Sequence, residues 1–140
     1  MRKVYLLLAG LLASPAYSAT SDCESAYSIL GPSVPLVIEA IKLHNANADY
    51  KTIAQWRSKT FNPQIEKIID ANQLSPQDMM NPELEITRDA YNDVMMRAKI
   101  FVDQTYAYSK GTVDATAVSE QREIINNVIQ QYKVKCVKTS

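Results

Sequence analysis

The chain has 140 residues, of which 15 are basic and 15 acidic, so its formal net charge is zero. That balance does not favour nucleic-acid binding, which needs a basic face or stripe. Glycine occurs only three times, too rarely for a chain of tight β-hairpins. The apolar residues recur mostly at steps of three and four, and we therefore expect an all-α protein.

The first residues form a predicted signal peptide. Two basic residues precede the apolar run Val4–Ala13, and small residues follow it. The run is about ten residues long, short of the roughly 20 that a spanning helix needs. Cleavage after Ser18 and cleavage after Ala19 fit equally well. We predict a cleaved signal at 1–19, a single helical domain at 20–140 and no membrane span after cleavage.

Two cysteines, Cys23 and Cys136, lie near the two ends of the predicted mature chain. In an exported protein such a pair is expected to form a disulfide. The bridge would close a loop of about 114 residues and stabilise the fold by ~4–5 kcal/mol in the chain-entropy model. Two free thiols and an intermolecular bridge are the alternatives. A redox-active pair is not favoured, because the spacing is not Cys-x-x-Cys.

The first helix is expected over residues 22–46. Ser21 and Glu24 have the spacing of a capping box, which indicates its start. Gly31-Pro32 should break it, because both residues disfavour a helix interior, and the helix should restart at once.

The second helix is expected over residues 50–73, after Asp49 as its N-cap. Pro63 should interrupt it, leaving either one kinked helix or two in tandem. Trp56 stands beside Arg57, a charge within an apolar stripe. The arginine either lays its stem along the core with its head in water, pairs with a buried carboxylate, or marks a cleft for an anionic or peptide group.

The central helix runs from Asn81 to Gly111. Asn81 suits the N-cap and Pro82 the first turn, while Lys110 and Gly111 suit the C-terminal end. One apolar stripe needs partner helices to cover it. The stripe consists of Leu84, Thr87, Tyr91, Val94, Ala98, Phe101, Thr105 and Tyr108.

The last helix follows Thr112 or Asp114 as its cap, and its stripe includes Val118 and Ile125. In an up-down bundle of four helices, the start of the first helix and the end of the last lie at the same pole. The two cysteines occupy those positions. The sequence therefore predicts a disulfide-closed up-down four-helix bundle, with its first helix broken at Gly31-Pro32 and its second near Pro63.

The sequence does not favour catalysis. Its only histidine, His44, lies at a helix end, where a role at the negative end of the dipole is common. The chain lacks Gly-x-Ser-x-Gly, a phosphate loop and His-Glu-x-x-His. We predict that the protein is not an enzyme and uses no cofactor or metal.

A carrier of haem, metal or another small ligand is the first alternative. His44 together with a methionine would suit haem, and Met79-Met80 or Met95-Met96 would suit copper(I). Neighbours in a helix point about 100° apart, however, so that neither pair faces one ion. Core filling explains Met79, Met80 and Met95 more simply.

Residues that break the helical pattern indicate a binding surface. Met96 and Ile100 lie one turn apart, away from the apolar stripe and among charged residues, with Tyr106 near the same side. An apolar pair ringed by charges is typical of an interface anchor with its rim. The alternative is that residues 75–80 or the first helix cover the pair. The predicted partner-binding residues are Met96, Ile100, Tyr106, Trp56 and Arg57.

Together these features predict a small exported module, periplasmic or secreted, that binds another protein of the cell envelope. The more specific prediction is an inhibitor or immunity-type protein that neutralises an envelope-acting toxin or enzyme. A chaperone-like or structural envelope component is the second alternative to the ligand carrier, and a homodimer is compatible with the pattern.

Overall fold

The computed structural model describes residues 18–137, and all its regular structure is helical. No strand occurs in that part of the chain, which confirms the all-α class. Of the predicted signal peptide, residues 1–17 lie outside the described residues. Residues 138–140 also lie outside them.

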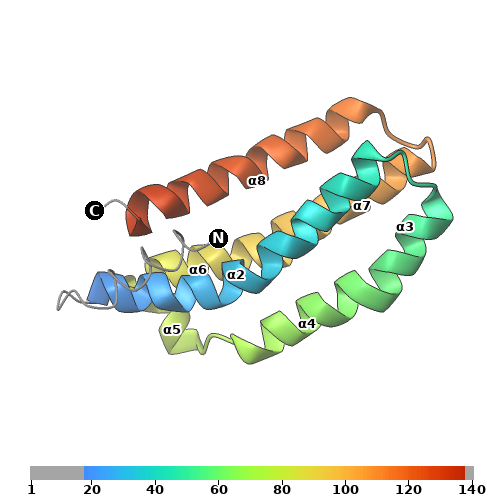
Figure 1. Ribbon diagram of the computed structural model, residues 1–140. Helices are drawn as coiled ribbons and strands as arrows, with labels where there is room; N and C mark the ends of the chain where they lie inside the picture. The colour runs from blue at the N-terminus through green and yellow to red at the C-terminus, as the bar shows by residue number, and fades with distance from the viewer. Residues whose placement is uncertain (1–17, 138–140) are drawn as a thin grey trace, which may run out of the picture.

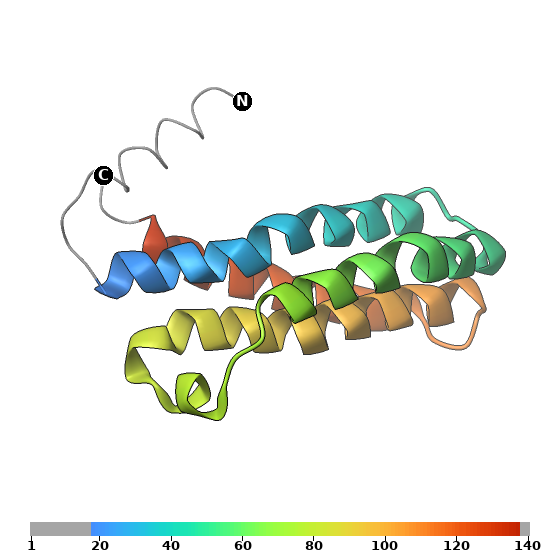
Figure 2. The ribbon, with the colours of Figure 1, turned by 90° about the horizontal axis from the view of Figure 1, so that it is seen from below.

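Long helical runs lie side by side along the molecule (Figures 1 and 2). They comprise α2 (Ser18–Asn45); α3 (Tyr50–Trp56), η1 (Arg57–Phe61) and α4 (Asn62–Ala71); the short α5 (Pro76–Met80); η2 (Pro82–Leu84), α6 (Glu85–Asp93), η3 (Val94–Ala98) and α7 (Lys99–Ser109); and α8 (Ala115–Cys136). The core lies where α2, α4 and the central run meet, and Phe61 and Phe101 are its largest fully buried side chains.

The prediction of a broken first helix is wrong. α2 continues from Ser18 to Asn45, with Pro32 and Pro35 inside it. A proline removes one main-chain hydrogen bond and crowds the preceding turn. Tertiary packing outweighs that local preference, because buried residues continue on both sides of the prolines. They are Ala26, Ile29, Leu30, Ser33, Leu36, Val37 and Ala40.

By length and composition alone, the segment Ser21–Asn45 of α2 could cross a membrane, with a mean hydropathy of 1.3. In this structure the same segment supplies core residues such as Ile29 and Leu36, both buried against the other helices. A central core helix of a folded domain meets the same criterion.

The second run also continues through its proline. The π-helical segment η1 precedes α4, and the Asn62 N–H donates to the carbonyl of Arg57, five residues back. This wider turn leaves Pro63 in the first turn of α4, where a missing N–H matters least. The helix is therefore continuous where a break near Pro63 was predicted, and a π segment precedes the proline.

The central run begins and ends where the sequence predicts. The side chain of Asn81 accepts a hydrogen bond from the Glu83 N–H, and Gly111 has a φ of 74°, in the left-handed region that favours glycine. Inside the run lies a second π-helical segment, η3, which the pattern did not predict. Five residues of the predicted stripe are buried: Thr87, Val94, Ala98, Phe101 and Thr105.

The predicted disulfide is confirmed. Cys23 and Cys136 are bonded, with their Cα atoms 5.6 Å apart, and they join the start of α2 to the end of α8 at one pole (Figure 1). The Tyr132 hydroxyl donates to the Cys23 carbonyl at 3.2 Å, so α8 is held to α2 by a hydrogen bond as well.

Asp22 has a role that the local pattern did not indicate. Its buried carboxylate accepts hydrogen bonds from the N–H groups of Ile86 and Thr87, at 2.9 and 2.8 Å, and so caps α6. The predicted capping box at Ser21 does not start the first helix, because α2 begins earlier, at Ser18.

Candidate protein-binding surface

The predicted apolar pair lies on the outer side of the central run. Met96, in η3, is 57% exposed, while Ile100, one turn on in α7, is half-buried. With that exposure, Met96 is not covered by residues 75–80 or by α2. Short π-helical segments within α-helices occur frequently at functional sites, and Met96 belongs to one.

Arg57 reaches from the first residue of η1 to α7. Its Nη2 lies 2.5 Å from Oδ1 of Asp103, and its Cζ lies 5.2 Å from the ring centroid of Tyr106. The two side chains of the ion pair are 29% and 56% exposed. Of the three interpretations of Arg57, the observed geometry is closest to a pairing with a carboxylate, but that carboxylate is exposed rather than buried. Water screens the pair, so it stabilises the fold by about 1 kcal/mol or less.

Lys110 approaches the same tyrosine. Its Nζ lies 5.5 Å from the ring centroid of Tyr106, from the position one turn further along the run. The sequence assigned Lys110 only to the helix end, although the spacing from Tyr106 allowed this contact. The approach of Arg57 from another helix had no signal in the sequence. We call Met96, Ile100, Arg57, Asp103, Tyr106 and Lys110 the outer α7 surface.

Trp56 takes a different position from its neighbour. It is partly buried, packs against the core cluster and lies with its ring centroid 5.4 Å from that of Phe61. Its indole N–H is buried and has no hydrogen-bond partner among the described residues. Trp56 therefore holds the start of η1 against the core and adds little to the outer α7 surface.

His44 packs between helices at the opposite pole from the disulfide. Its ring meets Tyr108 edge-on, with centroids 4.9 Å apart, and its Nδ1 is buried with no hydrogen-bond partner in residues 18–137. Burial, and to a smaller extent the charge of Arg122, lower the pKa of His44. This environment therefore favours the neutral imidazole. The described residues hold no group of three or more His, Cys, Asp or Glu side chains that would suit a metal ion.

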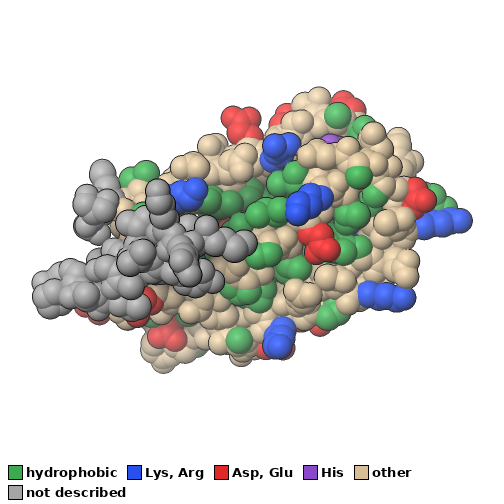
Figure 3. Space-filling model, in the orientation of Figure 1, with side chains coloured by type: hydrophobic (Ala, Val, Ile, Leu, Met, Phe, Trp, Pro, Cys, Tyr) green, Lys and Arg blue, Asp and Glu red, His purple; other side chains and the backbone are tan. Residues whose placement is uncertain are grey.

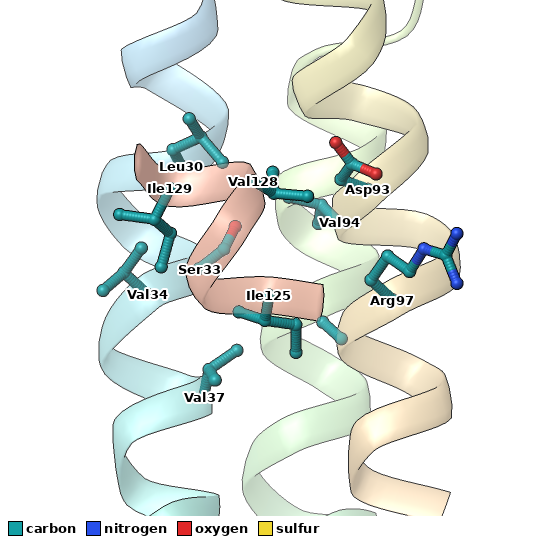
Figure 4. Close-up of a pocket in the computed structure, with 11 residues that line it drawn as sticks. Leu30, Ser33, Val34, Val37, Asp93, Val94, Arg97, Ile125, Val128 and Ile129 are labelled. Atoms are coloured by element: carbon teal, nitrogen blue, oxygen red, sulfur yellow. The ribbon is translucent and has the colours of Figure 1, made fainter. Parts of the chain in front are cut away.

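A small apolar cavity lies beneath α8. Hydrophobic side chains gather in a band between α8 and α2 (Figure 3), and residues of α2, α6, η3 and α8 line a partly open pocket of about 30 Å³ (Figure 4). Val34, Val94 and Ile129 are among its lining residues. Asp93 lies at its edge, and burial and the nearby carboxylate of Asp89 raise the pKa of Asp93, although Arg97 opposes the shift.

No family model, curated protein or solved structure matches this chain.

Proposed function

We propose that this chain is a small exported, periplasmic module that binds another protein of the cell envelope through the outer α7 surface. The observation that carries the proposal is the 57% exposure of Met96 beside Ile100, on a face otherwise occupied by charged and polar groups. An apolar anchor inside a polar rim is the usual anatomy of a protein interface.

Two features support export. The chain begins with an apolar segment compatible with a signal sequence, which we propose is removed at 1–19. The mature domain, 20–140, holds a disulfide, and such bridges persist mainly in oxidising compartments such as the periplasm.

We further propose that the scaffold is an up-down four-helix bundle. The disulfide between the start of α2 and the end of α8, and the short connections between neighbouring runs, support this topology. A scaffold closed in this way presents its surface with little ordering left to occur on binding.

Within this class, we propose an inhibitor or immunity-type protein that neutralises an envelope-acting toxin or enzyme. The rigid scaffold suits that role. Once a partner is captured, measuring its lytic or enzymatic activity with and without this protein tests the narrower proposal. A partner whose activity is unchanged at saturation would contradict it.

A ligand carrier is the second candidate, favoured by the apolar cavity beneath α8. Its volume of about 30 Å³ accommodates one or two water-sized groups. Small-molecule sites measure roughly 300–1,000 Å³, so haem would require α8 to move. A Soret band or stoichiometric metal in the purified protein would favour the carrier.

The binding surface can be tested with Met96→Asp combined with Ile100→Asp. The double variant should fail to capture from envelope extract the protein that the wild type captures, identified by mass spectrometry. Met80→Asp is the matched control, because Met80 is 84% exposed but lies on α5. Capture by the double variant at wild-type level would refute the surface.

Folding must be measured alongside capture, because Ile100 is half-buried. The free energy of unfolding should fall by no more than about 1 kcal/mol. If the double variant unfolds, Met96→Asp alone decides the question, since that side chain is mostly in solvent. Light scattering on the same samples distinguishes a partner from a second copy of this chain.

A further inference from the structure

Two cations from different helical runs converge on one aromatic ring. The Cζ of Arg57 and the Nζ of Lys110 lie 5.2 and 5.5 Å from the ring centroid of Tyr106. Each contact is favourable by itself, because the face of an aromatic ring attracts cations. The two like charges also repel one another, so an anion that joined them would lower the energy of the cluster.

The cluster has more positive than negative charge. Asp103 is the carboxylate paired with Arg57, and Lys110 has no carboxylate within 4.0 Å among the described residues. Lys99 is exposed one turn before Asp103 on the same helix and adds to the excess. The negative end of α7 offsets part of the charge of Lys110, but that effect is confined to the last turn.

Arg57 retains unused hydrogen-bonding capacity. A guanidinium has five N–H donors. The side chain of Arg57 makes one hydrogen bond within the described residues, from Nη2 to Asp103. A carboxylate is the group best suited to the remaining donors, because it accepts two parallel N–H bonds from a guanidinium.

We infer that the outer α7 surface binds an acidic segment of the partner protein. An Asp or Glu carboxylate of the partner lies between Arg57 and Lys110 at Tyr106, and an apolar side chain packs on Met96 and Ile100. The two contacts are about 9 Å apart along the helix, from Ile100 to Tyr106, which fits easily within an interface of about 800 Å² per partner. This inference rests on the proposed function and specifies the partner's chemistry.

A library of random peptides displayed on phage, selected on the immobilised protein, tests the inference. Retained peptides should combine apolar residues with Asp or Glu. Lys110→Gln should weaken their binding about threefold, and Lys110→Gln with Arg57→Gln about tenfold, with a flatter dependence on salt. Asp103→Asn should strengthen binding, because it removes the carboxylate that competes for Arg57.

The control variants separate this inference from the proposed function. Lys133→Gln removes an exposed positive charge on α8 and should leave peptide binding unchanged. If Met96→Asp abolishes binding while the Arg57 and Lys110 variants bind normally, the inference fails and the surface stands. If Met96→Asp and the Arg57 and Lys110 variants all bind normally, the inference and the proposed function both fail.

Two further probes exclude other anions. Phosphatidylglycerol vesicles and a single-stranded oligonucleotide should bind no better to the wild type than to the variant lacking both charges. A library that yields no acidic peptide, or vesicles or oligonucleotide bound through Arg57 and Lys110, would overturn the inference.

Discussion

The carboxylate of Asp22 and Thr87 form a buried contact between α2 and α6, although 65 residues separate them in sequence. Oδ1 of Asp22 accepts the Thr87 N–H at 2.8 Å and the Thr87 hydroxyl at 2.6 Å, while Oδ2 accepts the Ile86 N–H. The free N–H groups at the start of α6 are thus satisfied by another helix. The contact also holds α2 against α6 at Asp22, the residue directly before Cys23 of the disulfide.

Asp22→Ala should therefore lower the free energy of unfolding by about 2–3 kcal/mol, more than an exposed cap. The substitution removes an acceptor from three donors, two of them buried. Urea unfolding followed by circular dichroism measures the loss. Glu24→Ala, two residues away and exposed, is the control and should change stability by less than about 0.5 kcal/mol. Equal effects would show that the tertiary cap is unimportant.

Loss of the disulfide should destabilise the protein strongly. Cys136→Ser opens a loop whose two ends are 113 positions apart in the sequence and should reduce stability by about 3–5 kcal/mol. The combined Cys23→Ser and Cys136→Ser variant should resemble the single variant, because either change removes the whole bridge. A thiol assay on the unreduced, denatured wild type should detect no free sulfhydryl, and a full reaction at both cysteines would contradict the bridge.

Stability should depend on pH through His44, the only histidine in the chain. Burial lowers its pKa in the folded state, so the unfolded state binds the proton more readily. The histidine's contribution is present above the unfolded pKa, about 6.5. It is lost as the pH falls from there through the lower folded pKa. Unfolding measured between about pH 5 and 8 should show this slope, and His44→Gln should flatten it.

The pH dependence of stability that Asp93 contributes should have the opposite sign to that of His44. Burial and Asp89 raise its pKa, so the folded state disfavours its ionised form at neutral pH. Asp93→Asn should raise stability at pH 7, and the gain should shrink as the pH falls below the raised pKa, where Asp93 is protonated. Thermal unfolding of the wild type and the variant, at pH 7 and at a pH below the raised pKa, measures this gain. Asp70→Asn, exposed on α4, is the control, and a gain as large there would refute the explanation.

Local chemistry determined most of the helical segments and both ends of the central run. The spacing of Val94, Ala98 and Phe101 sufficed to predict one buried face, because a helix repeats every 3.6 residues. Asn81 and Gly111 marked the ends of the central run through caps that involve only near neighbours. The pairing of Cys23 with Cys136 followed from the chain having only two cysteines.

Tertiary structure alone decided the contacts between distant segments and the outcome where local preference and packing compete. Pro32 lies inside α2 because burial of Ile29 and Leu36 on either side outweighs the broken hydrogen bond. Asp22 caps α6, and Arg57 joins Lys110 at Tyr106, because packing brings these helices together. Such contacts depend on the relative positions of whole helices, and no local pattern of residue types records those positions.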